Sequence, residues 1–285
     1  MAIHIGCGSW RDDEYVGVLY PKGFPPKQRL RGYSQWFDRV ELNASYHSLP
    51  TPEMMAGWAA QTSKDFFFDV KLPRGFSDNA AAAAKSGLCE RTLESIRPLL
   101  DAKKFGMFLL TLSPSFTAKK HQLEELDDVV ETLRPHRIAV ELRSRDWVEG
   151  ARLTETLEHF RSRGLVWVAL DLPRINSPAL IPPIDEVTNP SAAYMRLHGR
   201  NPHYLSGENA KDKHRYSYPE RELKQIAERI QSLAAKAKDV HVSVNNHAED
   251  FAPKAAIALR RLLGQPVRTD LPELTEGGGE QGALF

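Results

Sequence analysis

Charged and amide side chains alternate with aliphatic ones in several short runs of this 285-residue chain. In the run 39–45, Glu41 and Asn43 fall on one face and Val40 and Leu42 on the other, because successive side chains of a strand point to opposite sides. The same alternation recurs in the runs 66–72, 137–143, 193–199 and 239–246. This pattern predicts strands with one apolar face and one face equipped for chemistry.

The polar residues near the ends of these runs are of the types used in proton transfer and anion binding. Carboxylates and histidines can move protons or hold a metal, and the expected catalytic residues are Glu41, Glu141, Asp171 and His198. Arginine and lysine suit phosphate and carboxylate ligands. The expected substrate-binding residues are Trp10, Asn43, Lys71, Arg143, Arg196, Asn245 and His247. The mixture of cations and acids favours an anionic ligand over a bare multi-metal centre.

Each of these residues also has a structural alternative. The charges could neutralise one another in an internal network, and His198 could be a hydrogen-bonded histidine of the interior. Trp10 could belong to the core. A divalent metal cofactor stays open, although the sequence contains no HExxH or paired-histidine spacing and does not identify metal ligands.

Eight strand-like runs alternate with helical patterns along the chain. The runs are 3–8, 39–45, 66–72, 105–112, 137–143, 165–172, 193–199 and 239–246, and the clearest helical segments are 87–101, 119–134, 152–164, 220–238 and 250–264. Repeated strand–helix units require parallel strands with right-handed crossovers, and eight units close as a barrel. An open doubly wound sheet would need strands that are apolar on both faces. We therefore predict an α/β fold, a single (β/α)8 TIM-barrel domain over residues 1–268.

Composition narrows the classes of partner. The chain has 38 basic and 37 acidic residues, so no bulk charge attracts it to nucleic acid or to an anionic membrane, and any anion site must be local. Cys7 and Cys89 are far apart and lack metal-type spacing, which argues against a disulfide framework and a structural zinc site. No apolar run approaches the roughly 18 residues of a membrane span. We expect a cytoplasmic protein with no membrane contact.

The last stretch, residues 269–285, differs from the rest in composition. It is acidic and rich in glycine, so we expect a disordered, flexible tail. Its end, QGALF, resembles the short peptide with which bacterial proteins dock on the DNA polymerase sliding clamp. The partner-binding residues implied by that resemblance are Gln281, Leu284 and Phe285.

Several ordered motifs together resemble the domain-of-unknown-function 72 family, also called YecE-like. They are GCGSW (6–10), YVGVLYP (15–21), YSQWFDRVELNASYHSLP (33–50), FFFDVKLP (66–73), AVELRSRDW (139–147), DLP (171–173), YMRLHGR (194–200) and VNNH (244–247). The likeness spans about residues 3–263 and implies a TIM barrel without an agreed activity. The chain departs from the family pattern at LTLSPSF (110–116) and in the helix after the eighth strand, so residues there are poor candidates for a shared role.

Three functions follow from these observations. The first is a cytosolic TIM-barrel enzyme that hydrolyses an anionic, phosphodiester or nucleotide-like substrate, linked to DNA replication or repair through a clamp-binding tail. The second is a non-catalytic barrel that binds an anion and is recruited by its C-terminal peptide. The third is a sugar-processing barrel enzyme with paired carboxylates. Whether the protein is an enzyme stays open at this point.

Overall fold

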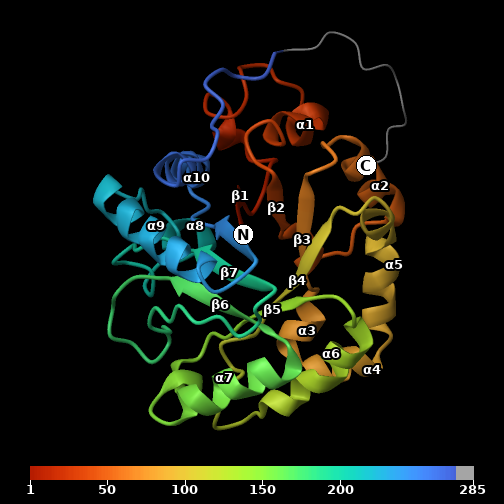
Figure 1. Ribbon diagram of the computed structural model, residues 1–285, viewed down its shortest axis with the longest axis vertical. Coiled ribbons are helices and arrows are strands. Elements are labelled where there is room, and N and C mark those ends of the chain that lie inside the picture. The colour runs from red at the N-terminus through yellow and green to blue at the C-terminus, as the bar shows by residue number, and fades with distance from the viewer. Residues whose placement is uncertain (274–285) are drawn as a thin grey trace.

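A computed structural model of the chain describes residues 1–273 and contains eight parallel strands arranged around a common axis (Figure 1). The strands are β1 Ala2–Cys7, β2 Arg39–Leu42, β3 Phe67–Lys71, β4 Phe105–Thr111, β5 Ile138–Glu141, β6 Val166–Asp171, β7 Ala192–Leu197 and β8 Asp239–Val244. Hydrogen-bonded neighbours follow the order β1-β8-β7-β6-β5-β4-β3-β2. Each strand lies inside, or within one residue of, its predicted run. The predicted TIM-barrel architecture is confirmed.

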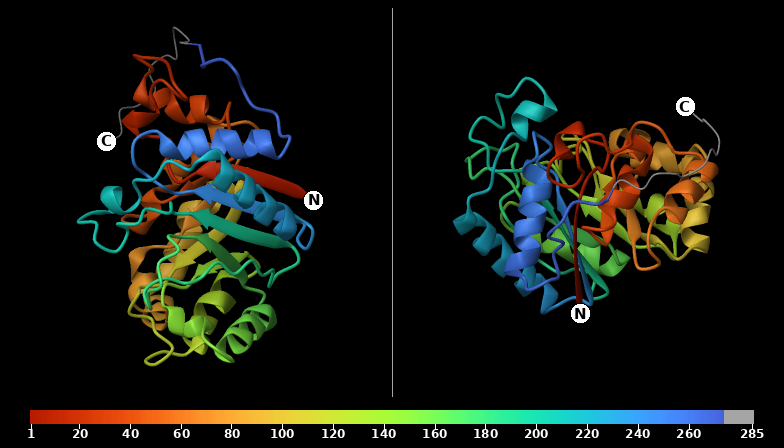
Figure 2. Two further views of the ribbon diagram at one scale, coloured as in Figure 1. Left: turned by 90° about the vertical axis from the view of Figure 1, so that its left-hand side faces the viewer. Right: turned by 90° about the horizontal axis from the view of Figure 1, so that it is seen from above.

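Helices cover the outside of the strands (Figure 2). They are α1 Arg29–Tyr33, α2 Pro52–Ala60, α3 Arg74–Asp78, α4 Ala80–Lys85, α5 Leu88–Asp101, α6 Asp127–Leu133, α7 Arg152–Arg163, α8 Ala210–Lys213, α9 Glu220–Ala234 and α10 Phe251–Leu262. In α9 the buried residues Leu223, Ile226, Ile230 and Leu233 recur at helical spacing, so one apolar stripe packs on the barrel. No helix within residues 1–273 combines the length and the apolar character that crossing a bilayer demands.

The helices differ from the sequence prediction in two places. Residues 74–78 and 80–85, outside the predicted helical segments, form α3 and α4, and the predicted helix 119–134 begins only at residue 123, as a 3-10 turn before α6. That start is set by Gln122 and Glu125, whose side chains and backbone amides bond reciprocally in a capping box. Residues 172–191 contain no helix, so β6 and β7 are joined by an irregular segment interrupted by prolines.

The seam between β1 and β2 is closed by a side chain instead of a strand ladder. The Tyr33 hydroxyl accepts from the Cys7 amide at 2.7 Å and donates to the Arg39 carbonyl at 3.0 Å. A Cβ on Gly6 would come within 2.3 Å of that same carbonyl oxygen, so only glycine permits this approach. The barrel is therefore nearly closed by backbone pairing and completed by Tyr33.

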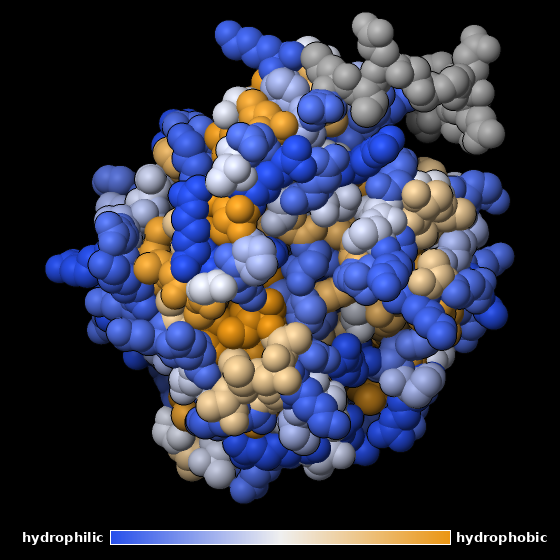
Figure 3. All heavy atoms as spheres, turned by 45° about the horizontal axis from the view of Figure 1, so that its top comes forward, coloured by the Kyte–Doolittle hydropathy of each residue, from blue (hydrophilic) through white to orange (hydrophobic). Residues whose placement is uncertain are grey.

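Polar residues dominate the molecular face in Figure 3, and apolar side chains appear there in several separate patches. Arg268, the last residue of the predicted domain, is held to the barrel, since its Nη1 donates to Gln35 Oε1 at 2.5 Å. The 1–268 boundary stays a prediction. Gln281, Leu284 and Phe285, the predicted docking residues, lie outside the described residues.

Candidate functional site

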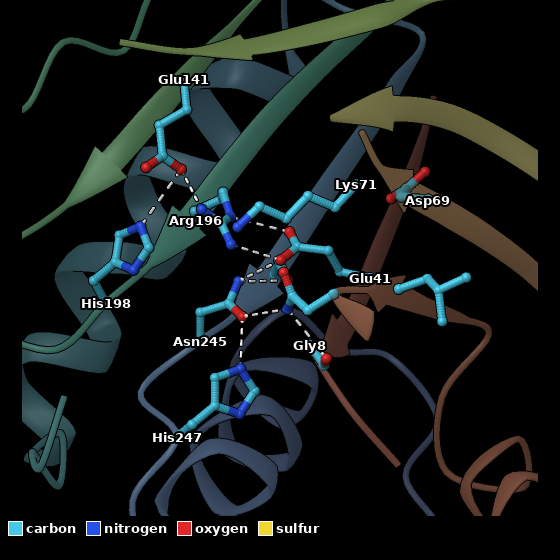
Figure 4. Close-up of polar contacts among 12 residues, drawn as sticks. Gly8, Glu41, Asp69, Lys71, Glu141, Arg196, His198, Asn245 and His247 are labelled. Carbon is cyan, nitrogen blue, oxygen red and sulfur yellow. Dashed lines mark hydrogen bonds and ion pairs between the residues drawn. The ribbon is translucent and has the colours of Figure 1, made fainter. Parts of the chain in front are cut away.

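At the carboxyl ends of the strands, Arg196 joins two buried carboxylates (Figure 4). Its Nε donates to Glu41 Oε2 at 3.0 Å, its Nη2 to Glu41 Oε1 at 2.7 Å, and its Nη1 to Glu141. A guanidinium matches two carboxylate oxygens at once, which fixes its orientation. Arg196 on β7 therefore ties β2 and β5 together across the barrel interior.

The carboxylate of Glu41 is fully occupied by donors. Tyr194 Oη donates to Oε2 at 2.9 Å and Asn245 Nδ2 to Oε1 at 3.0 Å, in addition to Arg196. Burial alone would raise the pKa of Glu41, but the charge and hydrogen bonds of Arg196, with the charge of Arg39, hold it far below its usual range. Such a carboxylate accepts protons poorly at neutral pH. The geometry favours an electrostatic role for Glu41 over the predicted general-base role.

Glu141 is held in the same way. Arg143 Nε donates to its Oε1 at 2.8 Å, and His198 Nε2 lies 3.6 Å from its Oε2. Burial opposes ionisation, yet Arg196 and Arg143 hold the pKa of Glu141 well below its ordinary value. Because the Arg196 guanidinium bonds both Glu141 and Glu41, the space between the two carboxylates is filled. A sugar placed between them would displace that guanidinium, so the arrangement does not support the glycosidase alternative.

His198 is the buried acid–base group of the site. It is 4% exposed, and its Nδ1 has no hydrogen-bond partner among residues 1–273. Burial lowers the pKa of His198, although Glu141 opposes that shift, so the imidazole is neutral at pH 7. A neutral imidazole with an unpaired ring nitrogen can take part in proton transfer. The geometry is consistent with the predicted role of His198.

Lys71 is the cation of this site without a carboxylate partner. Within residues 1–273, its Nζ makes no hydrogen bond and no ion pair shorter than 4.0 Å, and it lies 4.2 Å from the ring centroid of Tyr46. The Ser45 hydroxyl donates to the Lys71 carbonyl at 2.5 Å and fixes the backbone there. Burial, with the nearby charge of Arg196, lowers the pKa of Lys71 to about 8. The ammonium is therefore mostly charged at pH 7 and available to a ligand.

Arg143 offers further donors at the edge of the site. Its Nε bonds Glu141, whereas its two Nη groups have no hydrogen-bond partner among residues 1–273, and its side chain is 39% exposed. Together with Lys71 and Arg196 it gives three cations against the carboxylates of Glu41 and Glu141. The site therefore carries an excess positive charge.

Amide and imidazole groups from β1, β2 and β8 meet beside this network. Asn43 Nδ2 donates to Gly8 O at 3.1 Å and to Asn245 Oδ1 at 3.2 Å, and His247 Nε2 lies 2.8 Å from the same Asn245 oxygen. A Cβ on Gly8 would come within 2.2 Å of Asn245 Oδ1, so only glycine lets the chain pass this close to the Asn245 side chain. The structure thus brings the predicted residues Asn43, Asn245 and His247 together.

Trp10 belongs to the core. It is 5% exposed and packs edge-on against Trp58 and Phe68, with ring centroids 5.2 Å and 6.4 Å away. Burial of this kind leaves little of the indole for stacking on a ligand. The packing alternative, and not the expected ligand contact, describes Trp10.

We call the group formed by Glu41, Lys71, Glu141, Arg143, Arg196 and His198 the bowl. Asp171 lies outside it, contrary to the expectation that Asp171 shares a ligand with Glu41 and Glu141. Arg200 Nη2 and Arg229 Nη1 donate to its Oδ1 at 2.7 Å and 2.8 Å, and Tyr218 Oη donates to Oδ2 at 2.9 Å. Arg229 belongs to α9, which packs on the outer surface of the barrel. Asp171 therefore holds α9 and the segment after β7 against the barrel wall.

A second polar layer, which the alternating pattern did not predict, lies beneath Glu41. Arg39 Nη2 pairs with Asp69 Oδ2 at 2.5 Å and bonds Tyr194 Oη at 2.8 Å, and His241 Nδ1 lies 2.9 Å from Asp69 Oδ2. Arg39 precedes Glu41 by two positions and so shares its face, a signal that could have identified it. This layer supports the floor of the site.

The described residues do not fit a metal cofactor. Within residues 1–273, no three side chains of histidine, cysteine, aspartate or glutamate gather closely enough to hold a metal ion. The acids of the site instead bond guanidinium groups.

Comparison with known proteins identifies the family. The family described as "Protein of unknown function DUF72" matches residues 4–276. The chain belongs to the DUF72 family. The UPF0759 protein YunF of Bacillus subtilis is 26% identical over 255 residues, which cover 86% of this chain and 89% of that protein. The UPF0759 protein YecE of Escherichia coli K12 is 31% identical over 114 residues, covering 40% of this chain and 39% of that protein.

Solved DUF72 structures share the fold. The crystal structure of a DUF72 family protein from Thermotoga maritima is 29% identical, with a TM-score of 0.81, and the match covers 93% of this chain and 100% of that one. One from Enterococcus faecalis is 24% identical, with a TM-score of 0.82, covering 98% of this chain and 100% of that one. The resemblance read from the motifs is confirmed, and the matched segment extends past its predicted limit.

Proposed function

We propose that the bowl of this DUF72 barrel binds an anionic, phosphodiester or nucleotide-like molecule and hydrolyses it. The observation that carries the proposal is Lys71, a half-buried ammonium that has no carboxylate partner beside two carboxylates that are already saturated. Burying an uncompensated charge is unfavourable. An anionic ligand would supply the missing partner.

A phosphate group suits the donors that the site presents. The two Nη groups of Arg143 can bond two oxygens of one phosphate, and Lys71 can meet a third as a point charge. The Glu41 carboxylate does not repel such an anion, because Arg196 neutralises its charge and its oxygens face the groups that donate to them. The site therefore offers three donors for one tetrahedral anion.

Hydrolysis needs proton transfer as well as charge stabilisation. In the proposed step, water oxygen bonds to phosphorus and the ester oxygen leaves with a proton from the Lys71 ammonium. The attacking water returns a proton to the resulting amine, so charge and protons balance. A lysine with a pKa of about 8 can serve both as acid and as base near neutral pH. His198, which is neutral, is the second candidate for that transfer.

The test of this reaction compares turnover of bis(p-nitrophenyl) phosphate and of nucleotides by the wild type and Lys71→Met. Lys85→Met is the matched control, because Lys85 is 75% exposed on α4. We expect p-nitrophenol release by the wild type and the control and at least ~100-fold less by Lys71→Met. Equal release by all three would refute a catalytic role of Lys71.

A non-catalytic anion-binding barrel recruited by its tail is the second candidate. It is favoured by the QGALF sequence at residues 281–285, which resembles a sliding-clamp docking peptide. Under this proposal the protein binds phosphate compounds without turnover and co-elutes with a bacterial clamp. Deleting residues 281–285 should abolish co-elution, and co-elution that survives the deletion would eliminate the tail from the proposal.

A further inference from the structure

A second cavity of about 430 Å³ opens at the opposite end of the barrel, where the strands begin. We call it the lower pocket. It is lined by residues near the starts of β1, β3, β4 and β8 and by the turns that precede β3, β4 and β5, among them Lys64, Asp65, Lys103, Arg137, Asp239 and His241. Because it faces away from the bowl, it is separate from the site described above.

The lower pocket contains cations without ion-pair partners. Arg137 Nη1 lies 3.5 Å from Asp239 Oδ2 and is partly neutralised by it. Lys64 and Lys103, both exposed, form no ion pair with any residue up to Glu273, and neither does Asp65. Three cations thus face two carboxylates around the cavity, so the pocket has an excess positive charge.

The floor of the lower pocket is a fixed imidazole. His241 is 2% exposed, and its Nδ1 lies 2.9 Å and 3.0 Å from the two oxygens of Asp69. Because a carboxylate accepts, Nδ1 carries the proton, and Nε2 makes no hydrogen bond to any residue in the described range. Burial lowers the pKa of His241, so the neutral ring has an acceptor nitrogen available to a ligand.

Packing on both sides holds that ring in place. Phe67 lies 4.9 Å from it and Tyr194 5.9 Å, measured between ring centroids. Asp69 is in turn fixed by the Met107 amide at 3.1 Å and by Arg39 at 2.5 Å. A Cβ on Gly106 would come within 2.3 Å of Asp69 Oδ1, so only glycine fits beside the His241–Asp69 pair. The floor of the lower pocket is therefore preorganised.

Lys103 occupies a position that glycine would suit better. Its φ is +56°, and it follows α5 as the left-handed residue of a C-terminal cap, with Lys104 N bonded to Leu99 O at 2.7 Å. Glycine is the usual residue there, because a Cβ makes the left-handed conformation unfavourable. The chain instead places an ammonium at the edge of the lower pocket at a conformational disadvantage.

We infer that the lower pocket is a second anion site that binds a phosphate group between Lys64, Lys103 and the imidazole of His241. A hydrogen phosphate has oxygens for both ammonium groups and one hydroxyl that can donate to Nε2. A carboxylate offers two acceptors and no donor, so it satisfies fewer of these groups. The phenyl rings of Phe67 and Phe105 on the pocket wall suit an organic portion attached to the phosphate.

The test is titration with inorganic phosphate by calorimetry in Lys71→Met protein, which lacks the key cation of the bowl. We expect binding to persist there and to weaken at least ~10-fold when Lys64→Ala and Lys103→Gly are added. Glycine suits the left-handed backbone at position 103, so the melting temperature of the Lys103→Gly variant should not fall. Lys103→Arg should retain binding, and Lys119→Ala, an exposed control, should not alter it.

A second readout locates the phosphate. In ¹⁵N-labelled Lys71→Met protein, phosphate should shift the His241 Nε2 resonance, and the shift should vanish with Lys64→Ala and Lys103→Gly. Unchanged affinity in that combined variant, or a His241 resonance that does not respond to saturating phosphate, would overturn the inference. Loss of binding in Lys71→Met alone would also overturn it, because it would place all phosphate in the bowl.

Discussion

The Lys71 ammonium lies 4.2 Å from the ring centroid of Tyr46, and no carboxylate within residues 1–273 approaches it within 4.0 Å. An aromatic face compensates a cation only in part, by about 0.5–2 kcal/mol. The neighbouring acids, Glu41 and Glu141, instead bond Arg196. This division of partners leaves one positive group in the bowl for a ligand.

Lys71 should make ligand affinity depend on pH. Its folded-state pKa is lowered to about 8 from an ordinary value of 10.5, so the ammonium loses its proton as pH rises through about 8. Phosphate affinity should therefore fall between pH 7 and 9 in the wild type, measured by calorimetry. A bound anion raises the pKa of Lys71, so the affinity should begin to fall near the free-protein value of about 8 and level off at the higher pKa of the complex. The same decline in Lys71→Met would contradict the assignment.

The shift also has a consequence for stability. Since the folded pKa of Lys71 is lowered, the folded state binds fewer protons than the unfolded state between about pH 8 and 10.5. The contribution of Lys71 to the free energy of unfolding therefore becomes more favourable as pH rises across that window. Urea unfolding of wild type and Lys71→Met should show a difference that changes with pH above 8. A constant difference would indicate an ordinary surface lysine.

Removing Arg196 should destabilise the barrel. Arg196→Met leaves the buried carboxylates of Glu41 and Glu141 without their shared partner, and breaking a buried pair costs about 3–5 kcal/mol. Urea denaturation should show this loss at pH 7. The loss should shrink as pH falls, because protonation relieves the unpaired acids. An unchanged midpoint would mean that the network contributes little to stability.

Tyr33→Phe tests how the seam of the barrel is closed. The substitution removes the hydroxyl that bonds the Cys7 amide and the Arg39 carbonyl, leaving both groups buried without partners. We expect the free energy of unfolding to fall by about 1–3 kcal/mol. Tyr204→Phe is the control, since the Tyr204 hydroxyl bonds no residue in the described part of the chain. Equal effects of the two substitutions would show that the seam does not depend on Tyr33.

Asp171→Ala should lower stability without affecting the bowl. The substitution removes one carboxylate partner from Arg200 and one from Arg229, which keep Glu222 and Asp185. We therefore expect a loss of about 1–3 kcal/mol, the range for a lost hydrogen bond to a charged group. Phosphate affinity of the remaining folded protein should equal that of the wild type. A weaker phosphate affinity of the folded variant would indicate that Asp171 contributes to the ligand site.

The alternating pattern was enough to predict the barrel and much of the bowl. Glu41, Lys71 and Arg196 occupy inward positions because polar and aliphatic residues alternate along their strands, and parallel strand ends meet at one edge. The pattern failed at Asp171. In β6, Trp167 shares its face and packs on Phe160 of α7, so that face points outward. Apolar residues occupy both faces of β6, and alternation alone cannot tell which one lines the interior.

The sequence alone could not predict which charged side chains pair with one another. Arg196 could have paired with either carboxylate or with a ligand, and only the strand register shows that it bonds both. Tyr33 likewise closes a seam between segments whose approach depends on Gly6. Such contacts depend on distances between side chains far apart in the chain, which composition and periodicity do not encode.

The most direct test of the central claim is a calorimetric titration of adenosine 5′-monophosphate into Lys103→Gly protein, which lacks a key cation of the lower pocket, with and without Lys71→Met. We expect the Lys103→Gly protein to bind, and Lys71→Met to weaken that binding at least ~10-fold while the melting temperature stays equal or rises. Equal affinity of the two proteins would contradict the claim that the unpaired ammonium of Lys71 is an anion-binding group.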